Sequence, residues 1–179
     1  MADATADKKI VAAMKTMDEG DFKKAYAQFK KLTTEYPEDA ECWYGRAECG
    51  NYASGMFGAN IKIDEIIVAY EKACELDPEN VDYYQSYGLF CISVNKFDVA
   101  EQLYNEAAEM DESRSPALYS EFAIEYYNVI MANYGDIPED SPPAATAAIE
   151  KALIPYKKKA LSYMLKALEM SPEEAKSLL

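Results

Sequence analysis

The residues of this chain best suited to metal or redox chemistry are its four cysteines, Cys42, Cys49, Cys74 and Cys91. Zinc sites and redox motifs usually contain two cysteines separated by two residues. None of the four cysteines forms such a pair, and the chain has no histidine, the other common zinc ligand. We therefore expect buried, reduced thiols, no metal and no cofactor. Reduced cysteines are typical of the cytoplasm, where we expect the protein to lie.

A catalytic site is not expected either. Histidine, the commonest general base, is absent, and the acidic residues are scattered over solvent-facing positions of predicted helices. Residues 55–60, Gly-Met-Phe-Gly-Ala-Asn, lack the Lys-Ser/Thr pair of a phosphate-binding loop and follow no predicted strand. We expect no catalytic residues and a protein that is not an enzyme.

The chain is strongly acidic. Its 179 residues carry 32 acidic and 18 basic side chains, a formal net charge of −14, and residues 40–134 hold 17 acids against 5 bases. Phosphate binding depends on clustered lysine and arginine, so we expect neither nucleic acid nor a membrane as a partner. No apolar run approaches the roughly 18 residues that span a bilayer, and the first ten residues do not resemble a signal peptide. The acidic surface either keeps the protein soluble or attracts a basic partner.

A pattern of large and small residues recurs along the chain. Phe97, Ala100, Tyr104 and Ala107 share one face of a predicted helix, because three or four residues separate them. The same spacing occurs in the sets Phe22, Ala25, Phe29, Leu32; Ile63, Ile66, Tyr70, Ala73; and Lys157, Ala160, Met164, Ala167. Fifteen residues after the first member stand Pro37, Pro78, Glu112 and Pro172. This alternation suits closely packed helices, and four copies in phase indicate an internal repeat.

Another predicted helix precedes each copy of the pattern. These helices span residues 40–53, 81–94 and 115–134, and residues 5–19 form a weaker example. The repeating unit is therefore a helix, a tight turn and a second helix. Because one such unit buries its apolar face only against its neighbours, the units are expected to stack.

The repeats resemble those of the tetratricopeptide repeat (TPR) family, whose unit has about 34 residues. The copy at 81–114 matches that unit in frame at Tyr84, Tyr87, Gly88, Cys91, Phe97, Ala100, Tyr104 and Ala107. The preceding copy has Trp43 at its start and Arg46-Ala47 where the family has Leu-Gly. The resemblance implies an all-α fold, a right-handed superhelical solenoid of antiparallel helix pairs, in one domain over residues 1–179. We expect repeats at about 6–39, 40–80, 81–114 and 115–172, insertions at 51–62 and 133–148, and a C-terminal cap at 172–179.

The two insertions interrupt the regular pattern. The first is expected to form an exposed loop whose apolar tip, Met56-Phe57, either covers the protein itself or contacts a partner. The second includes a loop rich in proline and acid, followed by a helix over about 146–170 that Pro155 should kink or interrupt. We expect an elongated hairpin there, with Lys157–Lys159 as a solvated face.

The resemblance implies that the first helix of each pair lines a concave groove. The expected peptide-binding residues are Glu41, Tyr44, Glu48, Tyr52, Asp82, Gln85, Leu89, Tyr119, Ala123 and Tyr126. Tyrosine offers a large contact area and a hydroxyl for hydrogen bonds, although any one of these tyrosines could instead pack between helices. One TPR subgroup, the carboxylate-clamp co-chaperones, binds its targets with lysine, asparagine and arginine. These residues are absent at the matching positions of this chain, so we do not expect it to belong to that subgroup.

These features favour a non-catalytic protein-interaction module or adaptor. Its partner would be a protein or peptide segment, basic or aromatic and aliphatic in character. The alternative is a self-assembling structural or scaffold protein, a homo-oligomer that uses its terminal faces or the long hairpin of the fourth repeat.

Overall fold

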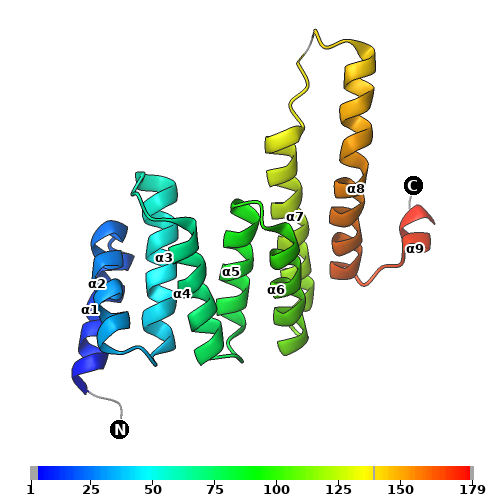
Figure 1. The fold of residues 1–179 in the computed structure, drawn as a ribbon. Coiled ribbons are helices and arrows are strands. Elements are labelled where there is room, and N and C mark those ends of the chain that lie inside the picture. Colours follow the sequence, from blue (N-terminus) through cyan, green and yellow to red (C-terminus); the bar gives the residue numbers. More distant parts are fainter. Residues whose placement is uncertain (1–3, 139, 178–179) are drawn as a thin grey trace. The chain divides into compact units, whose positions relative to one another are not determined.

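The computed structural model describes residues 4–138 and 140–177, and these ranges contain α-helices joined by short connections, with no strand (Figure 1). The helices are α1 (Ala4–Asp18), α2 (Phe22–Glu35), α3 (Ala40–Phe57), α4 (Ile63–Leu76), α5 (Val81–Ser93), α6 (Phe97–Met110), α7 (Ser115–Tyr134), α8 (Pro143–Ala167) and α9 (Pro172–Ser177). Every helix predicted from the sequence is present. Leu178 and Leu179, part of the expected C-terminal cap, lie outside the described residues.

The turns within helix pairs repeat at the level of single hydrogen bonds. After α1 and after α5, a residue with positive φ, Gly20 at 82° and Asn95 at 62°, ends the helix. In both turns this residue donates its N–H to the carbonyl three residues earlier, and the next N–H donates to the carbonyl five residues earlier. The bonds are Gly20–Met17, Asp21–Thr16, Asn95–Ile92 and Lys96–Cys91, at 2.8–3.2 Å. This helix ending is a Schellman motif, which satisfies the last carbonyl groups of a helix.

The turns between helix pairs also share one pattern. Tyr36, Asp77 and Asp111 each cap a helix by donating their N–H to the carbonyl four residues earlier. Each then accepts a hydrogen bond at 3.0–3.3 Å from the N–H three residues later. The residue that follows the cap, Pro37, Pro78 or Glu112, is the residue that marks the end of each sequence repeat. The sequence period therefore corresponds to a repeated backbone conformation.

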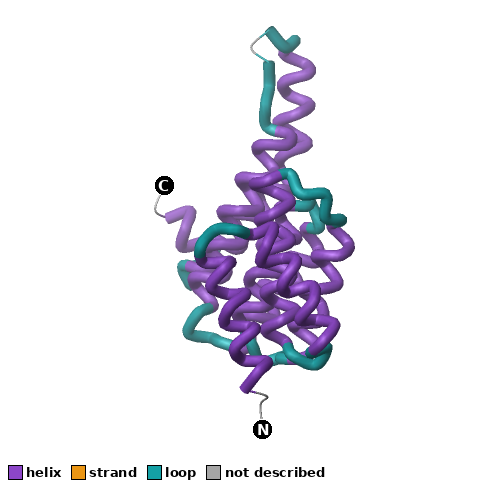
Figure 2. Tube along the Cα trace, turned by 90° about the vertical axis from the view of Figure 1, so that its left-hand side faces the viewer, coloured by secondary structure: helices purple, strands orange, loops and turns teal. Residues whose placement is uncertain are grey.

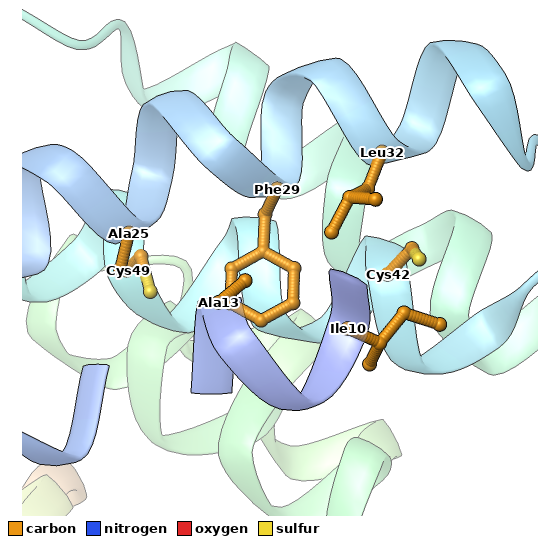
Figure 3. Packing of buried hydrophobic residues seen from close by; sticks show 7 residues of the cluster. All are labelled: Ile10, Ala13, Ala25, Phe29, Leu32, Cys42 and Cys49. Atoms are coloured by element: carbon orange, nitrogen blue, oxygen red, sulfur yellow. The ribbon is translucent and has the colours of Figure 1, made fainter. Parts of the chain in front are cut away.

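The chain forms two compact units, Met1–Tyr87 and Gly88–Leu179, which we describe separately. In the amino-terminal unit α2 packs on α1 and α3, and α3 packs on α4. Its core contains Ile10, Ala13, Ala25, Phe29, Leu32, Cys42 and Cys49, and Figure 3 shows the Phe29 ring among side chains of α1, α2 and α3. Ala25, Phe29 and Leu32 belong to the predicted repeat face. All four cysteines of the chain are free thiols and are buried, as predicted.

The carboxy-terminal unit is held together by aromatic side chains. α7 packs on α6 and on α8. Phe122 of α7 is fully buried, and its ring lies 5.5 Å from the Tyr104 ring of α6 and 4.5 Å from the Tyr163 ring of α8. α7 and α8 form the predicted long hairpin, whose far ends and connecting loop extend beyond α6 (Figures 1 and 2).

Two segments differ from expectation. Residues 51–57 do not form a loop: α3 continues to Phe57, and Gly58, in the left-handed conformation at φ 59°, ends it. The expected apolar tip is exposed nevertheless, with Met56 at 69% and Phe57 at 48%. α8 begins at Pro143 and continues through Pro155 as one helix. Pro143 suits the first turn of α8, because an N–H group there would have no partner within the helix.

Candidate functional site

Six of the expected binding residues lie in the amino-terminal unit, on α3 and α5. Glu41, Tyr52 and Asp82 are exposed, whereas Tyr44, Glu48 and Gln85 are half-buried. Tyr44 stacks on Tyr83 with 4.5 Å between ring centroids, and its hydroxyl lies 3.0 Å from the Ser86 hydroxyl. Tyr44 therefore joins α3 to the first turns of α5 and presents only part of its ring to solvent.

Glu48 lies on the same helix as Tyr44 but is engaged with α4. The Tyr70 hydroxyl, from a fully buried side chain, donates a short hydrogen bond of 2.5 Å to the Glu48 carboxylate. Burial raises the pKa of Glu48 above its ordinary value of 4.5, and the hydrogen bond from Tyr70 offsets only part of this effect. Burial, together with the nearby Glu48, also raises the pKa of Tyr70. This carboxyl group therefore makes an internal contact between α3 and α4.

The Glu48 carboxyl group is expected to make stability depend on pH. Between pH 4.5 and its raised pKa, the folded protein retains a proton that the unfolded chain has lost, so this contribution to stability falls as pH rises through that window. Glu48→Gln keeps an acceptor for Tyr70 and removes the titration. Urea unfolding from pH 4 to 8 should show the variant gaining stability over wild type as pH rises. Parallel pH profiles for the two proteins would contradict this role of Glu48.

Tyr52 belongs to a separate aromatic cluster at the end of α3. Its ring stacks on Phe22 of α2 at 4.8 Å between centroids, and Phe57 lies 6.0 Å from Phe22. Tyr52 is 41% exposed. The extension of α3 therefore covers the start of α2 and leaves an aromatic surface at its edge.

The carboxy-terminal unit contains the remaining four expected residues, and two of them are in its core. Leu89 is 40% exposed and Tyr119 is half-buried, but Ala123 and Tyr126 are 2% and 3% exposed. α8 packs over this side of α7, with Tyr163 against Phe122 and Tyr156 with its ring 6.4 Å from that of Tyr126. A partner therefore has little access to Ala123, and it reaches Tyr126 only through a pocket.

A pocket of about 410 Å³ lies beside Tyr126, and we call it the aromatic pocket. Its lining residues are Asn95, Phe97, Asp98, Tyr126, Pro155, Tyr156 and Lys159. The Phe97 ring meets the Tyr126 ring edge-on, with 5.1 Å between centroids. The pocket is formed by the start of α6, the middle of α7 and the part of α8 around Pro155.

The charged groups at the aromatic pocket leave one carboxylate available to a ligand. Lys159 forms an ion pair with Glu101 at 2.5 Å, and Glu101 also accepts a hydrogen bond of 2.8 Å from Tyr163. Burial raises the pKa of Glu101, but these hydrogen bonds outweigh it and place that pKa below the ordinary value. Burial and the nearby Tyr156, Glu101 and Asp98 raise the pKa of Tyr126 to about 12. Asp98 is exposed at the pocket.

Aromatic walls next to a carboxylate form a suitable site for a cationic side chain. A lysine or arginine over an aromatic face gains a cation–π interaction, and a carboxylate within reach adds an ion pair. Of the pocket residues, only Tyr126 was among those expected from the sequence. Asp98, Pro155 and Tyr156 line the pocket but were not among the residues expected from the sequence, although a proline inside a predicted helix was a visible irregularity.

Two further features bear on function. Among the described residues, no group of three or more histidine, cysteine, aspartate or glutamate side chains gathers in a way that could hold a metal ion. No helix in the described part of the chain combines the length and apolar character needed to cross a membrane.

Comparisons with known proteins give matches by fold alone. No protein-family model matches the chain, and no curated protein matches it in sequence. A crystal structure of MamA is similar with a TM-score of 0.65 and 19% identity, covering 96% of this chain and 81% of MamA. SycD, a type III secretion translocator chaperone of Yersinia enterocolitica, is similar with a TM-score of 0.57 and 16% identity over 74% of this chain and 96% of SycD. PilW, a type IV pilus biogenesis factor, is similar with a TM-score of 0.51 and 16% identity over 95% of this chain and 80% of PilW.

These similarities concern architecture. MamA, SycD and PilW share a TPR-like helical repeat fold, and the chain described here has the same fold class. The predicted all-α, TPR-like fold class is therefore confirmed. At 16–19% identity the likeness extends to the fold and not to individual binding residues.

Proposed function

We propose that the protein is a non-catalytic interaction module of about four TPR-like repeats that binds a basic segment of a partner protein. The aromatic pocket carries this proposal, because its walls and Asp98 suit an arginine or lysine side chain. The net charge of −14 is consistent with a basic partner and would speed its encounter with the protein. Known proteins of similar fold include a chaperone and a pilus biogenesis factor, which supports a role in protein binding.

The expected residues on α3 and α5 extend this proposal to the amino-terminal unit. There, Glu41, Asp82 and the half-buried Tyr44 would contact a basic or aromatic segment of a partner. In the carboxy-terminal unit, Tyr119 and Leu89 are the accessible members of the expected set. Asp98 and Tyr156 add to this set the charge and the ring surface that Ala123 and the buried Tyr126 cannot offer.

Peptide selection from a random displayed library tests the proposal with the full chain as bait. We expect the selected peptides to contain arginine or lysine next to aromatic or aliphatic residues. The pocket variant Asp98→Asn/Tyr156→Ala should bind them about tenfold more weakly, because one ion pair and one cation–π contact are lost. The matched control Asp64→Asn/Tyr127→Ala changes an exposed acid of α4 and an exposed tyrosine of α7, and should bind as wild type does. Equal affinity of the pocket variant and wild type for all selected basic peptides would refute the proposed pocket function.

A self-assembling scaffold is the second candidate. SycD, which has a similar fold, has been crystallised as a dimer. On α7 the exposed Ile124, Tyr127 and Tyr134 recur at helical spacing and offer an apolar contact. Sedimentation velocity over a hundredfold concentration range distinguishes the candidates, since a scaffold changes its sedimentation coefficient with concentration and a monomeric binder does not.

A further inference from the structure

One side of α8, continued by its C-cap residue Leu168, presents a line of side chains that are exposed except for the half-buried Leu165. We call this line the α8 seam, and its members are Lys151, Ile154, Lys158, Leu161, Leu165 and Leu168. Three or four residues separate successive members, the spacing with which one helix contacts another along its length. Ile154, Leu161 and Leu168 are 46%, 57% and 58% exposed. By contrast, Leu153, Ala160 and Tyr163 lie on the buried side of the same helix.

The α8 seam is basic although the protein is acidic. α8 carries five lysines and one glutamate, whereas the whole chain has a net charge of −14. Lys159 is paired with Glu101, and the Lys166 ammonium lies 4.3 Å from the centroid of the Tyr163 ring. Lys151, Lys157 and Lys158 are exposed and lie at or beside the seam. The local charge therefore favours a partner that is acidic where it meets α8 between Lys151 and Lys158.

The other end of the α8 seam leads to a pocket. This second pocket, of about 310 Å³, lies between the end of α8 and α9 and is lined by Ser162, Leu165, Lys166, Glu169, Met170 and Pro172. Leu165 belongs to both the seam and the pocket. The seam thus combines a basic half with an apolar half that ends in a hollow large enough for an apolar side chain.

We propose that the α8 seam binds an amphipathic, acidic helix of a partner protein. Carboxylates of that helix would pair with Lys151, Lys157 and Lys158, and its apolar side chains would cover Leu161 and enter the pocket beside Leu165. A second copy of this chain, paired through α8, fits poorly because α8 has five lysines and one glutamate and so offers few carboxylates to the lysines of the seam. An anionic membrane offers charge but no side chain to fill the pocket.

This site is separate from the aromatic pocket. Pro155 and Tyr156 follow Ile154 by one and two residues, and an α-helix turns about 100° per residue, so the aromatic pocket faces another side of α8. The proposal therefore assigns a second partner of opposite charge, and it does not depend on the pocket that binds a basic side chain.

A designed helical peptide provides the probe. It carries leucines separated alternately by three and four residues, as in the α8 seam, and glutamates at the positions beside them. A fluorescent label on the peptide reports its binding to the full chain by anisotropy. We expect saturable binding that weakens with salt. Lys151→Glu/Lys157→Glu/Lys158→Glu should weaken it by about tenfold or more, since three charge pairs become repulsive. The control Lys8→Glu/Lys23→Glu/Lys24→Glu, on exposed lysines of α1 and α2, should bind as wild type does.

Helix packing on the apolar half has its own test. Leu161→Ser is expected to reduce affinity for the acidic peptide while circular dichroism stays unchanged, because Leu161 is exposed in the free protein. A peptide with lysine in place of every glutamate should not bind the seam. No binding of the acidic peptide, or equal binding by the three-lysine variant, overturns the proposal. Preferential binding to phosphatidylserine vesicles, or self-association lost in the three-lysine variant, would assign the seam to another occupant and also overturn it.

Discussion

Phe122→Ala is expected to lower the free energy of unfolding of the carboxy-terminal unit by about 3–5 kcal/mol, the usual cost of removing a buried phenylalanine. Phe122 has no exposed surface, and its ring contacts Tyr104, Tyr126 and Tyr163 with centroid distances of 5.5, 5.5 and 4.5 Å. Each aromatic pair adds about 0.5–1.5 kcal/mol beyond the buried area. Because these rings come from α6, α7 and α8, the substitution removes the contact shared by all three helices.

Urea unfolding followed by circular dichroism measures this effect. Tyr127→Ala is the matched control, since Tyr127 lies on the same helix and is 40% exposed. We expect this control to change stability by less than about 1 kcal/mol. A Phe122→Ala transition that coincides with that of wild type would show that the three helices are held together by other contacts.

Gly45→Ala is expected to destabilise the amino-terminal unit by about 1–3 kcal/mol, the usual effect of overpacking a core. A Cβ atom at residue 45 would lie 2.5 Å from two ring atoms of Phe29, and that ring is fully buried between helices. Alanine ordinarily stabilises the interior of a helix by about 1 kcal/mol relative to glycine. The sign of the measured change therefore reports whether the Phe29 ring can move aside.

A double-mutant cycle isolates this contact. Phe29→Leu removes the ring atoms nearest to residue 45, and in that background Gly45→Ala should be neutral or stabilising. The fluorescence of Trp43, the single tryptophan of the chain, reports unfolding of the unit that contains both residues. An increase in stability from Gly45→Ala in the wild-type background would show that the Phe29 ring moves aside at little cost, and would contradict the expected overpacking.

The helices could be predicted from the sequence because their signals are local. Ala25, Ala100 and Ala107 occupy the small positions of the repeat face and are fully buried, as the alternation predicts. The turns between helix pairs could also be predicted, because Pro37 and Pro78 follow the helix caps. The extension of α3 could not be predicted, because Gly55 and Gly58 are typical of a loop. The contact of Phe57 with Phe22, which accompanies the extended helix, is a tertiary interaction.

The surface available to a partner could be predicted only in part. The family resemblance placed Tyr126 on a binding surface by its position in the repeat, but burial depends on how α8 packs against α7. Tyr156 and Tyr163, from the helix that follows the second insertion, pack over this side of α7, and Tyr156 lines the aromatic pocket. Sequence periodicity indicates which residues share a face and does not show which helix will cover that face.

Site-specific photocrosslinking in the source cell tests the central claim, that the aromatic pocket holds a basic side chain of a partner protein. A benzophenone amino acid replaces Tyr156, at the pocket, or Tyr127, outside it, and the crosslinked peptides are sequenced by mass spectrometry. We predict a crosslink from position 156 to a partner segment that contains arginine or lysine, and its loss when Asp98→Lys is added. Equal crosslinking from positions 156 and 127, or a crosslink unaffected by Asp98→Lys, would contradict the account.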